Sequence, residues 1–220
     1  MQGIMRKLEI LALLVTLAGS AAAEPVRPVA RIEGRPPAVW DGRAGADRWT
    51  HAVMSGLRGP ALTLVRAVPR DIAGWCPGYG AAGPGARQAF WLAFVGLLAR
   101  HESGLDPHAQ GGGGRWIGLM QISPATAAWR GCAAASPAAL ADGGENLACA
   151  LRIMARAVAR DGVIGGADAK GAAADWGPLR QQATRTAMMA RTRALPACRA
   201  GAQIRPRARP VDVPAGRTSG

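Results

Sequence analysis

The stretch RQAFWLAFVGLLARHESGLDPHAQGGGGRWIGLMQI, residues 87–122, decides the expected fold of this chain. From Gln88 to Ala99 nearly every position is apolar, and a helix that is apolar on all sides is normally buried in a core. Beyond Glu102, the residues Gly104 and Pro107 predict that this helix ends. The sequence therefore places the carboxyl group of Glu102 at the C-terminal end of a buried helix.

That position disfavours the ionised form of Glu102. Apolar surroundings raise the pKa of a carboxyl group, and so does the negative end of the helix dipole. A glutamate that stays protonated near neutral pH can act as a general acid. The competing interpretation is a solvated surface glutamate, which is the usual fate of a glutamate in the last turn of a helix.

Three motifs in a fixed order support the catalytic interpretation. They are ESGLDP at 102–107, GLMQI at 118–122 and ENL at 145–147. This order resembles the lytic transglycosylases of the soluble-lytic-transglycosylase (SLT) type, which have a lysozyme-like fold. The resemblance covers about residues 72–198. It implies a mainly α-helical, goose-type lysozyme-like domain, with a minor β element near the glycine run at 111–114, that acts on peptidoglycan glycan strands without a cofactor.

The resemblance also implies a mechanism with one carboxyl group. Glu102 would protonate the glycosidic oxygen between N-acetylmuramic acid and N-acetylglucosamine. The acetamido group of the substrate would stabilise the cation-like carbon, and Glu102 would then take the proton of the C6 hydroxyl group. The product is a 1,6-anhydro end, formed without water.

Further residues receive substrate-binding roles from the same resemblance. They are Ser103, Gly118, Met120, Gln121, Asn146 and Trp176. In this scheme Ser103 orients Glu102, Met120 packs against a sugar, and Gln121 bonds its polar groups. Each of Met120 and Asn146 has a structural alternative, as a core residue and as a helix cap respectively.

The late part of the chain departs from the family pattern. The family commonly has a tyrosine near the catalytic glutamate there, within a Tyr-Asn-Ala-Gly-like segment. This chain has Trp176 in the segment ADWGPLR, and an indole cannot supply a phenol hydroxyl group.

Other chemistries fit the residues less well. The pair His101-Glu102 does not continue as H-E-x-x-H, because residue 105 is leucine, so no metal site is expected. Ser103 lacks the G-x-S-x-G turn of a nucleophilic serine. Asp106, next to Pro107, is expected to bond locally rather than serve as a second catalytic carboxylate. A plain hydrolase and a non-catalytic peptidoglycan-binding module of an envelope or secretion assembly remain the alternatives.

Four cysteines indicate two disulfides, and three pairings are possible. We favour the nested pairing, Cys76–Cys198 with Cys132–Cys149, because the first two flank the helical region and the second two flank one loop. No C-x-x-C motif is present, so neither a redox site nor a zinc site is indicated.

The chain begins with the pattern of a secretory signal. Arg6 and Lys7 precede an apolar run, and the alanines at 21–23 form a cleavage site that would leave Glu24 first. The run is short for a membrane anchor. We therefore expect a periplasmic or secreted protein with no transmembrane segment after removal of the signal.

Composition and the family resemblance together suggest five segments. They are a signal peptide (1–23), a flexible Pro/Arg-rich lead (24–46), an N-terminal helical extension (47–70), the SLT-like catalytic domain (71–198) and a disordered basic tail (199–220). The net charge of +13 favours an anionic partner such as cell-wall polymer. Nucleic acid is disfavoured, because the chain has one tyrosine and two phenylalanines to stack on bases.

Overall fold

The computed structural model describes residues 35–199. The expected signal peptide, the lead up to residue 34 and the tail from residue 200 lie outside the described residues. The described part is mainly helical, with one small hairpin. Its elements are α1 (Ala46–Arg58), α2 (Leu62–Arg66), α3 (Ile72–Trp75), η1 (Tyr79–Ala81), α4 (Pro84–Ser103), β1 (Gln110–Gly111), β2 (Trp116–Ile117), α5 (Pro124–Arg130), α6 (Pro137–Leu140), α7 (Gly143–Asp161), η2 (Gly171–Ala174), η3 (Gly177–Arg180), α8 (Gln182–Arg193) and η4 (Pro196–Cys198).

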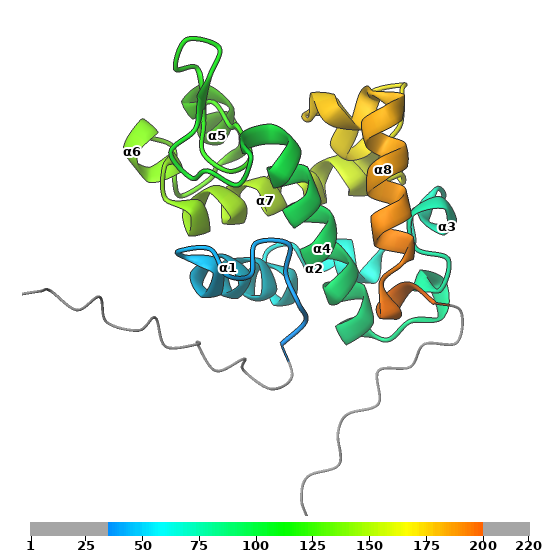
Figure 1. Cartoon of the computed structure of the whole chain (residues 1–220). Coiled ribbons are helices and arrows are strands. Elements are labelled where there is room, and N and C mark those ends of the chain that lie inside the picture. Colours follow the sequence, from blue (N-terminus) through cyan, green and yellow to red (C-terminus); the bar gives the residue numbers. More distant parts are fainter. Residues whose placement is uncertain (1–34, 200–220) are drawn as a thin grey trace, which may run out of the picture. The chain divides into compact units, whose positions relative to one another are not determined.

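Helix α4 is the central element, as the sequence predicts. Proline at its first position fits the helix start, since that residue needs no N–H partner. Its middle is buried on all sides, and Figure 1 shows α4 passing between α1 and α8. Aromatic side chains pack edge to face around it. The ring centroids of Trp91 and Phe94 lie 5.4 Å apart, and those of Trp75 and Phe94 lie 5.2 Å apart. This packing fixes the direction in which the end of α4 points.

The segment before α4 belongs to the same core. Helix α1 packs along α7, and Gly56 lets the two backbones approach, because a Cβ there would lie 2.7 Å from Leu151 Cδ1. Trp40 is fully buried, and its indole N–H donates to Thr50 Oγ1 over 2.8 Å. The packed chain therefore starts before residue 46, which corrects the expectation of a flexible lead up to that position.

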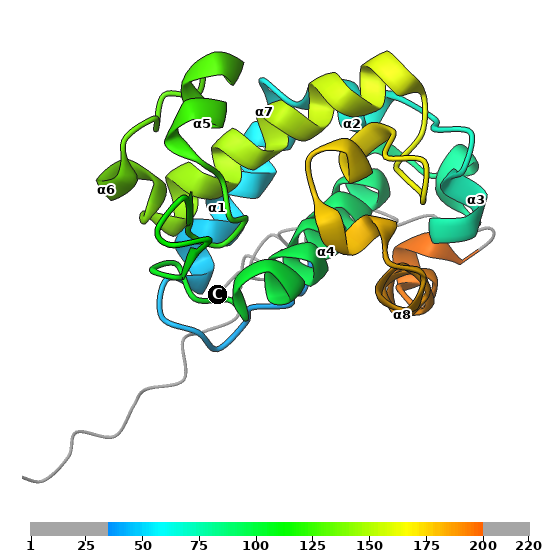
Figure 2. The ribbon, with the colours of Figure 1, turned by 90° about the horizontal axis from the view of Figure 1, so that it is seen from above.

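The β element expected near the glycine run is present. Strands β1 and β2 pair antiparallel, with Gln110 opposite Ile117 and Gly111 opposite Trp116. Figure 2 shows this hairpin, α5 and α6 at one end of the molecule and α3 and α8 at the other, with α4 and α7 running between them. The end of α4 thus lies beside the hairpin and the segment that follows it.

Short helical segments lie before α4 and after α7. The first are α3 and η1, which are anchored by the buried side chains of Ile72, Trp75 and Tyr79. After α7, the chain forms η2, η3 and α8 in place of one continuous helix. Pro178 lies in the first turn of η3 and has no N–H for a continuous helix.

Both disulfides of the nested pairing are present. Cys76 bonds Cys198 across 122 residues of sequence, and Cys132 bonds Cys149 across 17. The first joins the chain before α4 to η4, and the second joins the loop after α5 to α7. Between residues 35 and 199, no helix has the length and apolar character needed to cross a membrane.

Candidate active site

Glu102 lies in the last turn of α4, and the helix ends immediately after it. Gly104 adopts a left-handed conformation (φ 64°), and its N–H donates to the carbonyl of Arg100 over 3.1 Å. This is a common way for a helix to stop. Leu105 also has a positive φ (68°) and is buried, so the chain turns back into the core at once. The half-buried carboxyl group is left at the helix end, as the sequence predicts.

The surroundings of Glu102 favour its protonated form. Burial raises the pKa of this carboxyl group to about 7, and the positive charge of Arg180 opposes that rise. Asp106, the nearest acid in sequence, accepts a hydrogen bond from the His108 N–H over 2.8 Å within its own turn. Near neutral pH, Glu102 can therefore both give and accept a proton.

Ser103 connects the end of α4 to the segment Gly118–Gln121. Its Oγ lies 3.0 Å from the carbonyl oxygen of Ala99 and 3.0 Å from that of Leu119, and its hydroxyl hydrogen can be donated to either. The first contact is within the helix and the second crosses to the segment. Ser103 therefore holds this segment beside Glu102.

The segment Gly118–Gln121 requires special backbone conformations. Gly118 has a φ of 79°, and a Cβ there would collide with the carbonyl of Leu140 and the amide of Asn146. Gln121 has a positive φ (47°), which is uncommon for a residue other than glycine. Its Nε2 donates to the carbonyls of Ala109 (3.1 Å) and Gly118 (3.0 Å). The amide hydrogens of Gln121 thus hold the segment, and its carboxamide oxygen lies against Gly111.

Asn146 lies behind this segment and is fully buried. Its Oδ1 accepts from the Met120 N–H over 2.9 Å, and its Nδ2 donates over 2.9 Å to the carbonyls of both Ile117 and Leu140. All the amide hydrogens are used, so the expectation that Asn146 faces the substrate is not met. It does not cap α7 either, because Asp142 accepts the first N–H groups of that helix.

Met120 and Trp176 are also placed behind the surface. Met120 is fully buried, and Trp176 is 3% exposed. The indole N–H of Trp176 donates to the carbonyl oxygen of Met120 over 3.0 Å. Neither side chain is available to a sugar in this arrangement, which corrects the expectation of direct contact. Trp176 instead supports the segment Gly118–Gln121 through its hydrogen bond to Met120.

Arg180 is a site residue that the sequence analysis missed. It ends η3, and its Nη1 donates to the carbonyl of Ala173 over 2.7 Å. Helix α4 packs against η3, which brings the guanidinium group close enough to lower the pKa of Glu102. One arginine among many carries no local signal in the sequence, because its closeness to Glu102 arises only from the packing of the two elements.

Comparisons with known proteins agree with this geometry. Residues 83–167 match the Transglycosylase SLT domain. Among solved structures, the wild-type form 2 of Bd0314 DslA has 28% sequence identity and a TM-score of 0.67, over 75% of this chain and 99% of that chain. A Glu-to-Gln mutant of DslA has 29% identity and a TM-score of 0.65, over 72% of this chain and 95% of that chain. No curated protein sequence matches the chain. The chain carries an SLT-type domain of lysozyme-like fold.

The residues matched to the SLT domain hold most of the site. Glu102, Ser103, the segment Gly118–Gln121 and Asn146 all lie inside the matched range. Arg180 lies outside the matched range, on η3, and the packing of η3 against α4 brings it close to Glu102.

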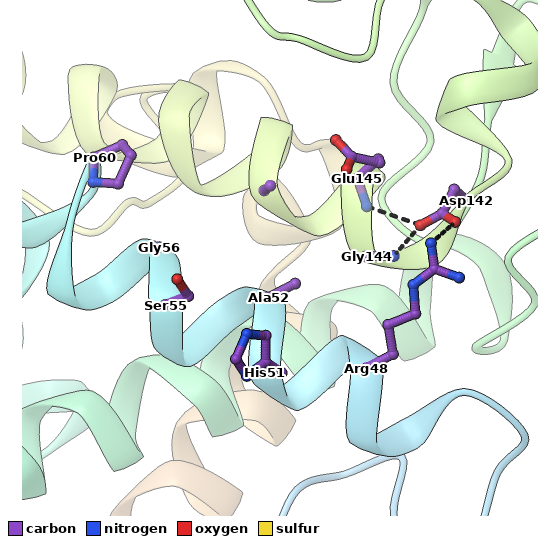
Figure 3. A pocket seen from close by; sticks show the side chains of 10 residues that line it. Arg48, His51, Ala52, Ser55, Gly56, Pro60, Asp142, Gly144 and Glu145 are labelled. Carbon is purple, nitrogen blue, oxygen red and sulfur yellow. Dashed lines mark hydrogen bonds and ion pairs between the residues drawn. The ribbon is translucent and has the colours of Figure 1, made fainter.

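A separate groove lies between α1 and the first turns of α7. It has a volume of about 350 Å³, and its lining includes His51, Ser55 and Glu145. Figure 3 shows the ion pair between Arg48 of α1 and Asp142 before α7, which joins its two walls. None of the predicted site residues lines this groove, so it is distinct from the site around Glu102.

Proposed function

We propose that this protein is an exported peptidoglycan lytic transglycosylase that cleaves the β-1,4 bond between N-acetylmuramic acid and N-acetylglucosamine. The SLT-type domain supports a peptidoglycan-active protein of the lytic transglycosylase type. The observation that carries the finer proposal is the half-buried carboxyl group of Glu102 at the end of α4, whose pKa burial raises to about 7.

The proposed reaction uses Glu102 twice. Its protonated carboxyl group gives a proton to the glycosidic oxygen as the bond from that oxygen to C1 breaks. The acetamido oxygen of the same N-acetylmuramic acid stabilises the positive charge at C1. The Glu102 carboxylate then takes the proton of the C6 hydroxyl group, and O6 bonds to C1. Water is neither consumed nor released, and Glu102 ends in its starting form.

A pKa near 7 suits this double role. A group with a much lower pKa would rarely be protonated for the first step and would be a weak base in the second, and one with a much higher pKa would be a weak acid in the first step. Inverting glycosidases need a second carboxyl group to activate water, and retaining ones commonly use it as the nucleophile. The acid nearest to Glu102 in sequence, Asp106, is held within its own turn by the His108 N–H, which favours the transglycosylase over a two-carboxylate hydrolase.

Export is part of the proposal. Two disulfides are typical of proteins from oxidising compartments, and we propose a periplasmic or secreted protein that begins near Glu24 after removal of residues 1–23. N-terminal sequencing of the mature protein tests this, and a chain that retains Met1 would contradict it.

The chemistry is tested by digesting purified sacculi and analysing the released muropeptides by mass spectrometry. The proposal predicts 1,6-anhydro-N-acetylmuramic acid ends, which borohydride does not reduce. Reducible ends would make the protein a hydrolase. Binding to sacculi with no release under varied conditions would favour the alternative, a peptidoglycan-binding module of an envelope or secretion assembly.

A further inference from the structure

Trp129, at the end of α5, is unusually open to solvent. It is 74% exposed, against 44% for Trp116 and 54% for Val68, the other large exposed apolar residues between residues 35 and 199. Single exposed apolar residues are common on protein surfaces, but an aromatic ring that is held in place offers a rigid contact surface to a ligand.

The ring of Trp129 is backed by a buried charge pair. The guanidinium carbon of Arg130 lies 4.2 Å from the ring centroid, within the range of a cation–π contact. That guanidinium bonds a carboxylate oxygen of Asp175 over 3.0 Å, and the side chains of both residues are mostly buried. One face of the indole is thus occupied by Arg130, which limits how far the ring can turn.

The element that carries Trp129 is tied down at several points. The Oγ of Ser123 accepts from the Thr126 N–H over 3.0 Å at the start of α5. At its end, Arg152 donates to the carbonyl of Arg130 over 3.0 Å, and Cys132 is bonded to Cys149 of α7. A binding surface on such an element needs little ordering when a ligand arrives, which favours affinity.

Trp129 is also connected to the site around Glu102 from two sides. Helix α5 follows the segment Gly118–Gln121 after two residues. Asp175, which holds Arg130, precedes Trp176, whose indole supports the same segment through Met120. The residues that hold Trp129 in place are therefore next in sequence to residues that hold the segment beside Glu102.

The charge pair beneath the ring retains hydrogen-bonding capacity. Within the described chain, the Nε of Arg130 and the second carboxylate oxygen of Asp175 are buried without a partner. Such atoms are normally satisfied by a protein group, a water or a ligand. Both atoms lie beneath the ring and are shielded from solvent, so a ligand can contact only the open face of the indole, which suits an apolar C–H face.

We propose that Trp129 forms a saccharide-stacking subsite, in which the open face of the indole packs against the C–H face of an N-acetylhexosamine ring of the glycan strand. This inference rests on the proposed function, because it takes the strand held at Glu102 as the ligand. Arg130 and Asp175 are positioning residues that keep the ring open. The subsite binds a sugar away from the bond that is cut, so it acts on long strands more than on short ones.

The test measures binding in full-length Glu102→Gln protein, which cannot cut its ligand under the proposed mechanism. Peptide-free glycan oligosaccharides of two and eight sugars are titrated by calorimetry. Adding Trp129→Ala should weaken binding of the long oligosaccharide by about tenfold, the loss typical of one aromatic anchor, and change binding of the disaccharide little. Trp129→Phe keeps a ring and should lose less. Val68→Ala, the exposed control, should change neither.

The outcomes separate this inference from the proposed function. If the Glu102→Gln protein binds the long oligosaccharide and Trp129→Ala binds it equally well, the subsite is wrong while the proposed function stands. If wild-type protein releases nothing from sacculi and its Glu102→Gln form binds no glycan, both fail. If Trp129→Ala weakens binding only of fragments that carry stem peptides, the ring serves the peptide and the saccharide assignment is overturned.

Discussion

Burial and Arg180 act on Glu102 in opposite directions. Burial favours the neutral carboxyl group, and the guanidinium of Arg180 favours the carboxylate, with a resulting pKa of about 7. At neutral pH neither form dominates. The sequence alone predicts the burial, because the apolar run before Glu102 is local. It does not predict Arg180, which lies 78 residues later along the chain.

Arg180→Ala tests this balance. Loss of the positive charge should raise the pKa of Glu102, because one of the influences that lower it is gone. If protonated Glu102 starts the reaction, the rate of fragment release falls as pH rises through this pKa. The variant should therefore keep its activity to higher pH than the wild type. Arg191→Ala, an exposed arginine on α8, should leave the pH profile unchanged. A profile of Arg180→Ala that stays in place or moves to lower pH would contradict the role of Arg180.

The raised pKa of Glu102 also affects stability. A glutamate has a pKa near 4.5 when unfolded, and Glu102 has one of about 7 when folded. Between these values the folded protein binds more protons than the unfolded chain, so the wild type loses stability as pH rises from 4.5 to 7. Glu102→Gln lacks this loss. Its Tm relative to that of the wild type should rise across this window and then level off, and a constant difference from pH 4 to 8 would count against the raised pKa.

At the scale of elements, the sequence predicts the helices whose starts or cores are set by neighbouring residues. The apolar run predicts α4, and Ser123-Pro124 predicts the start of α5. Ser136-Pro137 predicts the start of α6 in the same way. The 3₁₀ segments η1 and η3 carry no such pattern, and the buried side chains of Tyr79 and Leu179 fix them in the core. The ENL motif predicts a helix start, but only the fold reveals that Asn146 supports the segment beside Glu102.

Asn146→Ala should therefore destabilise the whole domain. It leaves the Met120 N–H and the carbonyls of Ile117 and Leu140 buried without their side-chain partner. The Ile117 carbonyl keeps the Ile122 N–H as a donor, so two groups are left unsatisfied. At about 1–3 kcal/mol each, we expect a total loss of roughly 2–6 kcal/mol in the free energy of unfolding. Urea unfolding measures it. Arg156→Ala, an exposed change on the same helix, should stay within about 0.5 kcal/mol, and equal stability of the two variants would refute the supporting role.

At the scale of the whole molecule, the two nested disulfides should stabilise the fold to different extents, because they close loops of different length. In the chain-entropy model, the 122-residue loop of Cys76–Cys198 is worth about 5 kcal/mol and the 17-residue loop of Cys132–Cys149 about 3 kcal/mol. Replacing each pair by serines should therefore lower the free energy of unfolding more for the first pair. The reverse order in urea unfolding would show that local packing around Cys132–Cys149 outweighs loop closure.

The fold class and the position of Glu102 at the end of α4 could be predicted, because both follow from short motifs. Which side chains lie on the surface that would contact a substrate could not be predicted from the sequence. The motifs point to Met120, Asn146 and Trp176. The burial of these side chains depends on how α7 and the segment around Trp176 pack behind residues 118–121. Trp129 and Arg180 show the converse, since a residue without a motif becomes prominent only when the packing exposes it or brings it beside Glu102.

The most direct test of the central claim is the release of soluble fragments from sacculi by Glu102→Gln, compared with wild type at equal amounts of bound protein. Glutamine keeps the size of the side chain and removes the proton that must be given and reclaimed. General acid–base catalysis by one group is worth about 10²–10⁴-fold, and with one residue in both steps we expect a loss at the upper end of this range while binding to sacculi persists. Release by Glu102→Gln at the wild-type rate would contradict the account.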